Sequence, residues 1–180
     1  MTDLVLTLIG PDRPGLVQAV AGIIAAHGGN WLESRMTHLA GKFAGILRAE
    51  LPPERAAAAL KALAALEGQG LKIVAETVTR SERAALERTM DLELLGLDRP
   101  GIVREIAQVL ADGGVNVEEL TTNRTSAPMS GEILFEARAH VHVPASVDLA
   151  KLRAALERVA SDLMVELKLE DRPRVAARVP

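Results

Sequence analysis

The sequence contains no cysteine, no tyrosine, and only three aromatic side chains among its 180 residues. The absence of cysteine excludes disulfides, thiolate metal ligands and cysteine nucleophiles. The scarcity of aromatic rings removes the stacking surfaces with which proteins hold single-stranded nucleic acid. No apolar run reaches the roughly 18 residues of a membrane-spanning helix. No basic segment precedes an apolar run at the N-terminus. We therefore expect no signal peptide and no membrane segment.

An excess of charge of one sign is also lacking. The chain has 24 acidic and 21 basic residues, which gives a net charge of −3 at pH 7. Such a balance gives no support for direct binding of nucleic acid. The apolar fraction of 48% is typical of a folded globular protein. The composition therefore favours a cytoplasmic protein with no direct nucleic-acid partner.

Catalytic signatures are missing as well. The sequence has no G-x-S-x-G, H-E-x-x-H or P-loop motif. His140 and His142 would share one face of a strand, as a metal pair would, but two ligands from one strand do not make a site. We predict a protein that is not an enzyme and that uses no metal or cofactor.

The chain does contain an internal repeat. IGPDRPGLV occupies residues 9–17 and LGLDRPGIV occupies residues 95–103, so that Gly15 and Gly101 are 86 positions apart. The same offset aligns residues 4–45 with the second copy without a gap, and Gly45 then matches Gly131. Both the alternating apolar residues and those at helical spacing coincide in this alignment. Two periodicities in register indicate duplication. We predict homologous units over 1–80 and 87–170, a charged connector over 79–88, and a C-terminal tail over 171–180.

Each unit reads as β-α-β-β-α-β. Leucines at positions 4, 6 and 8 alternate with other residues, which indicates a strand with one apolar face. Apolar residues at helical spacing follow, with Pro14 and Pro100 expected in the first helical turn. Two more strands, a second helix and a short final strand complete the unit. The prediction is an α+β protein of two ferredoxin-like units, each with an antiparallel sheet and helices on one face.

The repeated Asp-Arg-Pro-Gly loop leads from the first strand into the first helix. Unpaired amides at a helix N-terminus suit an anion, and a glycine there lets a ligand approach the backbone. The aspartate can cap the helix or accept a bond from an ammonium group, and the arginine can bind a carboxylate. Asn30 and Asn116 begin the next strand, where we expect them close to the same helix. These groups suit an amino acid, but Asp before Pro is also an ordinary helix start, so a purely structural role stays open.

The loop, together with Gly28-Gly29-Asn30 and Gly113-Gly114-Val115-Asn116, resembles the ACT domain family of amino-acid-binding regulatory modules. The stretches 30–35 and 127–131 look like the glycine cleavage system transcriptional repressor group within it. The resemblance implies that the ligand binds at the interface of paired ACT units, through the glycine loop and the asparagine. It also implies a regulator without a DNA-binding domain of its own, acting on a DNA-binding activator.

The hypothesis is therefore a non-catalytic regulator that binds a small amino acid, with glycine and serine as candidates, and that modulates a transcriptional regulator of amino-acid metabolism. We expect it to form a homo-oligomer. The alternatives are a ligand-independent protein interaction module and a regulatory subunit of a metabolic enzyme. Two units occupy the whole chain and leave no room for a catalytic domain. The candidate ligand-binding residues are Asp12, Arg13, Gly15, Leu16, Asn30, Asp98, Arg99, Gly101, Ile102 and Asn116.

Overall fold

The computed structural model describes residues 1–78, 88–127 and 131–172, and the chain divides into two units between residues 82 and 83. The predicted connector and tail lie outside the described residues, except for positions 88, 171 and 172. Among the described helices, none combines the length and the apolar character needed to cross a membrane.

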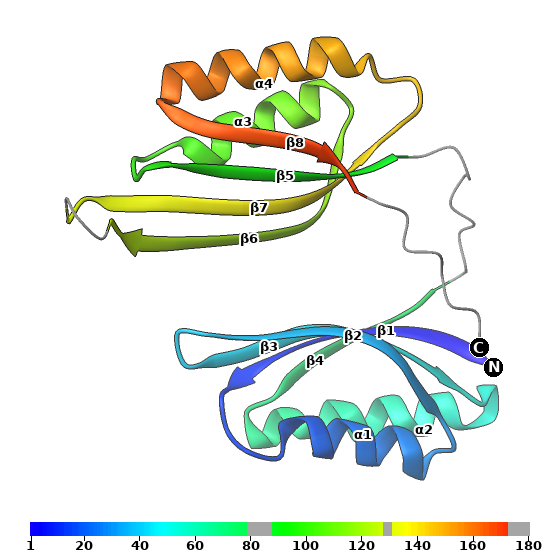
Figure 1. The fold of residues 1–180 in the computed structure, drawn as a ribbon. Helices are drawn as coiled ribbons and strands as arrows, with labels where there is room; N and C mark the ends of the chain where they lie inside the picture. The colour runs from blue at the N-terminus through cyan, green and yellow to red at the C-terminus, as the bar shows by residue number, and fades with distance from the viewer. Residues whose placement is uncertain (79–87, 128–130, 173–180) are drawn as a thin grey trace. The chain divides into compact units, whose positions relative to one another are not determined.

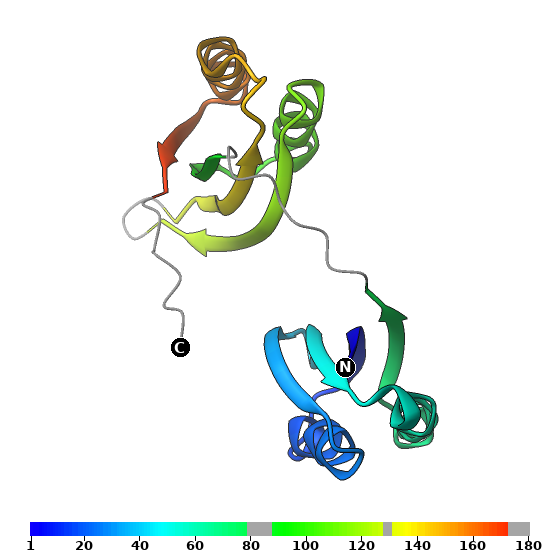
Figure 2. The ribbon, with the colours of Figure 1, turned by 90° about the vertical axis from the view of Figure 1, so that its right-hand side faces the viewer.

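The first unit has a four-stranded sheet in the order β2-β3-β1-β4, with every neighbouring pair antiparallel. Both helices lie on one face of this sheet, and the other face carries no helix (Figures 1 and 2). The elements are β1 (Thr2–Pro11), α1 (Leu16–Ala26), β2 (Asn30–Leu39), β3 (Lys42–Leu51), α2 (Pro53–Ala64), the 3₁₀ turn η1 (Ala65–Gln69) and β4 (Lys72–Thr77).

The second unit repeats this topology with the strand order β6-β7-β5-β8. Its elements are β5 (Arg88–Leu97), α3 (Ile102–Asp112), β6 (Asn116–Ser126), β7 (Ile133–Val143), α4 (Leu149–Leu163) and β8 (Val165–Asp171). The predicted α+β fold, with two β-α-β-β-α-β units and helices on one face of each antiparallel sheet, is confirmed.

Each core lies between the sheet and its two helices. Leu4, Leu6 and Leu8 of β1 are at most 1% exposed, because alternate residues of a strand point to one face. Val20 and Ile24 of α1 pack against them in the same cluster. Each such side chain contributes about 1.5–3 kcal/mol on burial. The central strand and first helix of the unit are thereby fixed, and so is the loop that joins them.

The second hairpin shows where the ungapped repeat is wrong. Gly45 lies opposite Leu8, whereas Ala137 lies opposite Leu94, so the structural equivalent of Gly45 is Ala137 and not Gly131. The first hairpin turns through Ala40 and Gly41, both with positive φ, as in a two-residue turn. The second has residues 127–132 between its last paired positions. Hairpin loops tolerate such insertions because strand pairing restores the register beyond them.

The prolines of the repeated loop lie ahead of the helices rather than in the first helical turn. Helix α1 begins at Leu16 and α3 at Ile102, and Pro14 and Pro100 occupy the preceding turn. The reason lies in the intervening glycines, whose φ values of 92° and 99° belong to the left-handed region and cannot continue a right-handed helix.

Candidate functional site

Both Asp-Arg-Pro-Gly loops leave the first turn of a helix without a side-chain cap. The first intrahelical bonds are donated by the amides of Ala19 and Glu105 to the carbonyls of Gly15 and Gly101, at 2.9 and 3.0 Å. Among the described residues, no side chain caps either N-terminus. The suggestion that the loop aspartates act as caps is therefore wrong, and the amides ahead of these bonds face the loop, where they can hold an anion.

The space over the first glycine is open. A Cβ placed on Gly15 would meet no atom within 4 Å, and one placed on Gly101 would meet only Glu105 Oε1, at 3.4 Å. Leu16 and Ile102, the next residues, are 5% and 2% exposed. Their side chains anchor the helices in the cores, so they can offer a ligand only their backbone amides.

The two loop aspartates have different partners. Asp12 Oδ2 lies 3.8 Å from His38 Nε2, a distant attraction that exists only when the histidine is protonated. Asp98 Oδ2 lies 2.7 Å from Arg124 Nε. The side chain of Asp12 is 45% exposed and that of Asp98 only 24%. The carboxylate of Asp12 is therefore available to a ligand ammonium, whereas that of Asp98 is already neutralised by a permanent cation.

The two loop arginines also differ. Arg13 Nη2 donates to the carbonyl of Gln69 at 3.1 Å, which ties the loop to η1. Arg99 is half-buried and has no hydrogen-bond or ion-pair partner among the described residues. Helix α3 carries Glu105 in its first turn, beside Gly101, whereas the first turn of α1 contains no acid. The Glu105 carboxylate opposes a second anion at that helix start, although Arg104 Nη2, 3.4 Å from its Oε1, offsets part of the charge.

The asparagines lie at the other end of each sheet. Asn30 and Asp3 are both opposite Glu50, while the loop follows Pro11, which is opposite Lys42. Eight residues of strand, about 27 Å, separate Asn30 from the loop of its own unit. Asn116 has the same place in the second unit, level with Thr89. Each asparagine is exposed and lies near the C-terminal end of its helix, so no single unit brings loop and asparagine together.

One ACT domain family matches residues 2–76, and a second ACT domain family matches residues 85–161. The chain is a tandem pair of ACT domains. The resemblance found in the sequence is thereby confirmed.

Two relatives that match along most of their length belong to one group of ACT proteins. The glycine cleavage system transcriptional repressors of Escherichia coli (strain K12) and Shigella flexneri are each 24% identical over 162 residues, which cover 89% of this chain and 85% of the relative. An unknown protein from Galdieria sulphuraria matches with a TM-score of 0.86 and 29% identity over 96% of this chain and 99% of its own. A candidate glycine cleavage system transcriptional repressor matches with a TM-score of 0.69, 19% identity and coverage of 96% and 98%, and this likeness concerns the fold alone.

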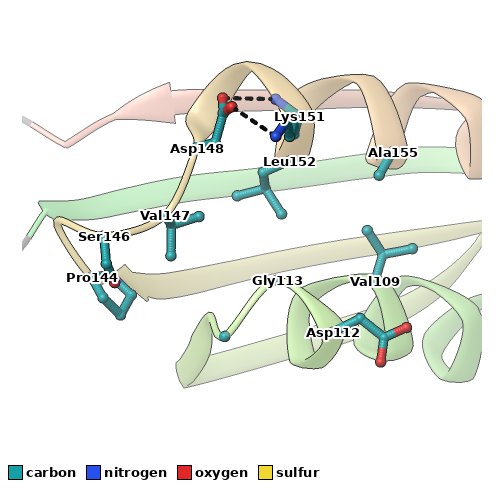
Figure 3. A pocket seen from close by; sticks show the side chains of 11 residues that line it. Val109, Asp112, Gly113, Pro144, Ser146, Val147, Asp148, Lys151, Leu152 and Ala155 are labelled. Carbon is teal, nitrogen blue, oxygen red and sulfur yellow. Dashed lines mark hydrogen bonds and ion pairs between the residues drawn. The ribbon is translucent and has the colours of Figure 1, made fainter.

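The second ACT domain also contains a groove between the end of α3 and the start of α4, with a volume of about 620 Å³ (Figure 3). Sequence reasoning missed it, since it depends on how two helix ends meet. None of the ten candidate residues lines it, and its polar rim pairs internally, with Lys151 Nζ 3.6 Å from Asp148 Oδ2. Its lining residues are Val109, Asp112, Gly113, Gly114, Pro144, Ser146, Val147, Asp148, Lys151, Leu152 and Ala155.

His140 lies between two carboxylates on the second sheet. Its Nδ1 lies 2.5 Å from Asp91 Oδ1, and its Nε2 lies 3.8 Å from Glu119 Oε2. Within the described part of the chain, no three histidine, cysteine or acidic side chains are arranged to hold a metal ion.

The rim residue Asp148 caps α4, and this provides a stability prediction. Its Oδ1 accepts from the amides of Ala150 and Lys151 at 3.1 and 3.2 Å. The Lys151 amide is the main reason that the pKa of this carboxyl lies below its ordinary value. We expect Asp148→Ala to lower the melting temperature of the second domain at neutral pH, with Asp148→Ser close to wild type because serine also caps.

The same substitution should show a pH dependence. A carboxyl whose pKa is lower in the folded state stabilises the fold above its unfolded pKa, near 3.9. That contribution disappears as the pH falls through the folded value. Thermal denaturation of wild type and Asp148→Ala should therefore converge in acid. A difference in melting temperature that is absent at pH 7 or grows in acid would rule out this capping role.

Proposed function

We propose that this tandem ACT protein is a non-catalytic regulator that binds a small amino acid, glycine or serine being the first candidates, at its Asp-Arg-Pro-Gly loops. The observation that carries the proposal is the first loop. There, open helix amides, an uncovered Gly15 and the exposed carboxylate of Asp12 all belong to residues 12–18. Amides suit the ligand carboxylate and Asp12 suits its ammonium group.

The placement of the asparagines adds a requirement to this proposal. Asn30 lies a strand's length from the loop of its own domain. An asparagine that contacts the bound amino acid must therefore come from another ACT domain, whether of the same chain or of a second copy. This agrees with the family expectation of a ligand bound where ACT domains pair, and with a homo-oligomer.

The regulatory part of the proposal rests on the relatives. Two of them are transcriptional repressors of the glycine cleavage system, and both align along most of their length. We propose that this chain acts in the cytoplasm on a DNA-binding activator of amino-acid metabolism, and that the amino acid changes its affinity for that protein. A ligand shifts such an equilibrium only by the difference between its affinities for the two states.

The test is a thermal-shift screen of the purified protein with each amino acid, followed by calorimetric titration of those that act. At 100 times the dissociation constant, the expected stabilisation is about 2.7 kcal/mol. Glycine, serine or another small amino acid should raise the melting temperature, and large amino acids should not. Neither heat nor stabilisation with any amino acid at millimolar concentration would refute amino-acid sensing and leave the ligand-independent interaction module.

A gel-shift assay tests the proposal that the chain does not contact DNA directly. The purified chain alone should give no gel shift with a promoter fragment. Adding the DNA-binding activator should produce a shift that responds to the amino acid. A gel shift by the chain alone would contradict this part of the proposal.

A further inference from the structure

The helix-free face of the first ACT sheet has an apolar centre. Ile9, Ile46 and Val74 point to this face from β1, β3 and β4, and their exposed fractions are 48%, 48% and 50%. Thr7 of β1 lies between Ile46 and Val74, and Val5 and Ile9 follow on either side of it along the strand, because residues two apart share a face. Three half-exposed branched aliphatic side chains on adjacent strands form a continuous patch rather than scattered exceptions.

The second ACT domain shows that the fold does not require apolar residues there. Thr7 lies opposite Ile46 and Val74, and the corresponding residues of the second sheet are Glu93, Arg138 and Lys168. The positions of Ile46 and Val74 are thus apolar in one copy and charged in the other, whereas the counterpart of Ile9, Leu95, is also apolar and is 39% exposed. If the fold needed apolar side chains at these two positions, the second domain would carry them as well. The exposed Ile46 and Val74 therefore indicate a contact made by the first sheet and not by the second.

Charge on this face is separated along the strands. One end is acidic and carries Asp3, Glu33, Glu50 and Glu76, with Arg48 paired to Asp3 at 2.6 Å and to Glu33 at 3.5 Å. The other end is basic, with Lys42 and Lys72, and no acidic residue of the four strands points to the face at that end. The apolar centre lies between the two ends.

We propose that this face binds the same face of a second copy of the chain, forming a two-fold dimer in which the two sheets stack with their strands antiparallel. A two-fold axis that runs across the strands, through the row of Ile46, Thr7 and Val74, places each of these residues near its own copy. The same row ends on the edge strand β2 at the exposed Arg35, which lies opposite Ile46. The axis also places Lys72 of each chain over Glu76 of the other. Sheets packed in this way lie about 10 Å apart.

The charge pattern of this face is complementary to itself, which favours a second copy of the chain as its partner. A two-fold interface must present the same patch twice, and a patch with an acidic end, an apolar centre and a basic end matches itself only when it is reversed. A wholly acidic or basic partner would leave one charged end of the face opposed by like charge. This inference does not depend on the proposed amino-acid site.

The first experiment measures the mass of the full-length protein by sedimentation equilibrium. We expect wild type at twice the chain mass of 19.2 kDa. The double variant Ile46→Arg/Val74→Lys should sediment as a monomer. Its new residues are those that the second ACT domain carries at the same positions, so we expect it to fold. A single cooperative unfolding transition in Trp31 fluorescence checks that the variant is folded. The matched control Arg138→Ala/Lys168→Ala alters the second face and should remain dimeric.

Exchanging the charges of Lys72 and Glu76 tests whether the partner is the same face of a second copy with its strands running in the opposite direction. Lys72→Glu places acid over Glu76 of the second copy and should raise the dimer dissociation constant about tenfold or more. Lys72→Glu combined with Glu76→Lys restores opposite charges across the two-fold axis and should recover most of the wild-type affinity. A monomeric wild type, a dimeric Ile46→Arg/Val74→Lys variant, or a double exchange weaker than the single one would overturn the proposal.

Discussion

Replacement of Leu6 by alanine is expected to lower the free energy of unfolding of the first ACT domain by about 2–5 kcal/mol. Leu6 is 0% exposed on the central strand β1 and belongs to the core cluster of that domain. The loss combines the transfer free energy of the deleted atoms with the cost of the cavity that they leave. Among our predictions for stability this is the largest.

Urea unfolding followed by Trp31 fluorescence measures this effect selectively. Trp31 is the single tryptophan of the chain and packs, partly buried, against the same core. Arg55→Ala is the control: its side chain is exposed on α2, and the expected change stays within about 0.5 kcal/mol. A Leu6→Ala loss below about 1 kcal/mol would mean that β1 is not the centre of the core.

For ligand binding, the largest effect is expected at Asp12. Asp12→Ala should weaken binding of the amino acid about ten- to a hundredfold, because a charged hydrogen bond contributes about 1.5–3 kcal/mol. The substitution at the equivalent position, Asp98→Ala, should leave affinity close to wild type, since that carboxylate is already held by Arg124 at 2.7 Å. Calorimetric titration with the amino acid that gives the largest thermal shift compares the two variants.

Comparing the affinities of Asp12→Ala and Asp98→Ala shows whether only the first loop binds the ligand or whether both aspartates merely support the fold. Each substitution removes one carboxylate at the same point of the same fold, so nonspecific damage should appear in both. Equal losses of affinity would contradict the assignment of the first loop as the better site. A loss confined to Asp98→Ala would reverse it and make Arg124 a positioning residue for the second loop.

Much of the fold could be predicted because the signals were local and repeated. Alternating leucines at positions 4, 6 and 8 indicated the central strand, and the glycines at 28 and 114 marked the helix ends that the structure shows. Duplication provided a second copy of each pattern, which is why the element order of both units could be predicted from one pattern.

The rest could not be predicted, for identifiable reasons. An insertion in the second hairpin leaves no trace in an ungapped comparison when a glycine happens to recur at the same offset. The helix start depended on the left-handed glycines at 15 and 101, and a proline before such a glycine looks the same in sequence as a proline in the first helical turn. The different partners of Asp12 and Asp98 required His38 and Arg124, which are distant in sequence.

Site geometry was the harder part. The position of Asn30 at the start of the strand after the first helix, together with the family resemblance, suggested that it shares a site with the loop. Helix α1 carries the chain back along the sheet, so β2 begins level with the start of β1 rather than with its end, and β3 lies between the two strands. Strand direction in a β-α-β unit would have revealed this before any coordinates were known.

The measurement that tests the central claim most directly is an amide chemical-shift titration of the ¹⁵N-labelled protein with the amino acid that stabilises it. The largest changes should fall on Gly15, Leu16 and Val17 at the start of α1, with a second set at an asparagine, Asn30 or Asn116. Changes that instead centre on the groove residues Val109, Val147 and Ala155, or that leave Gly15 unmoved at saturation, would show that the ligand binds elsewhere.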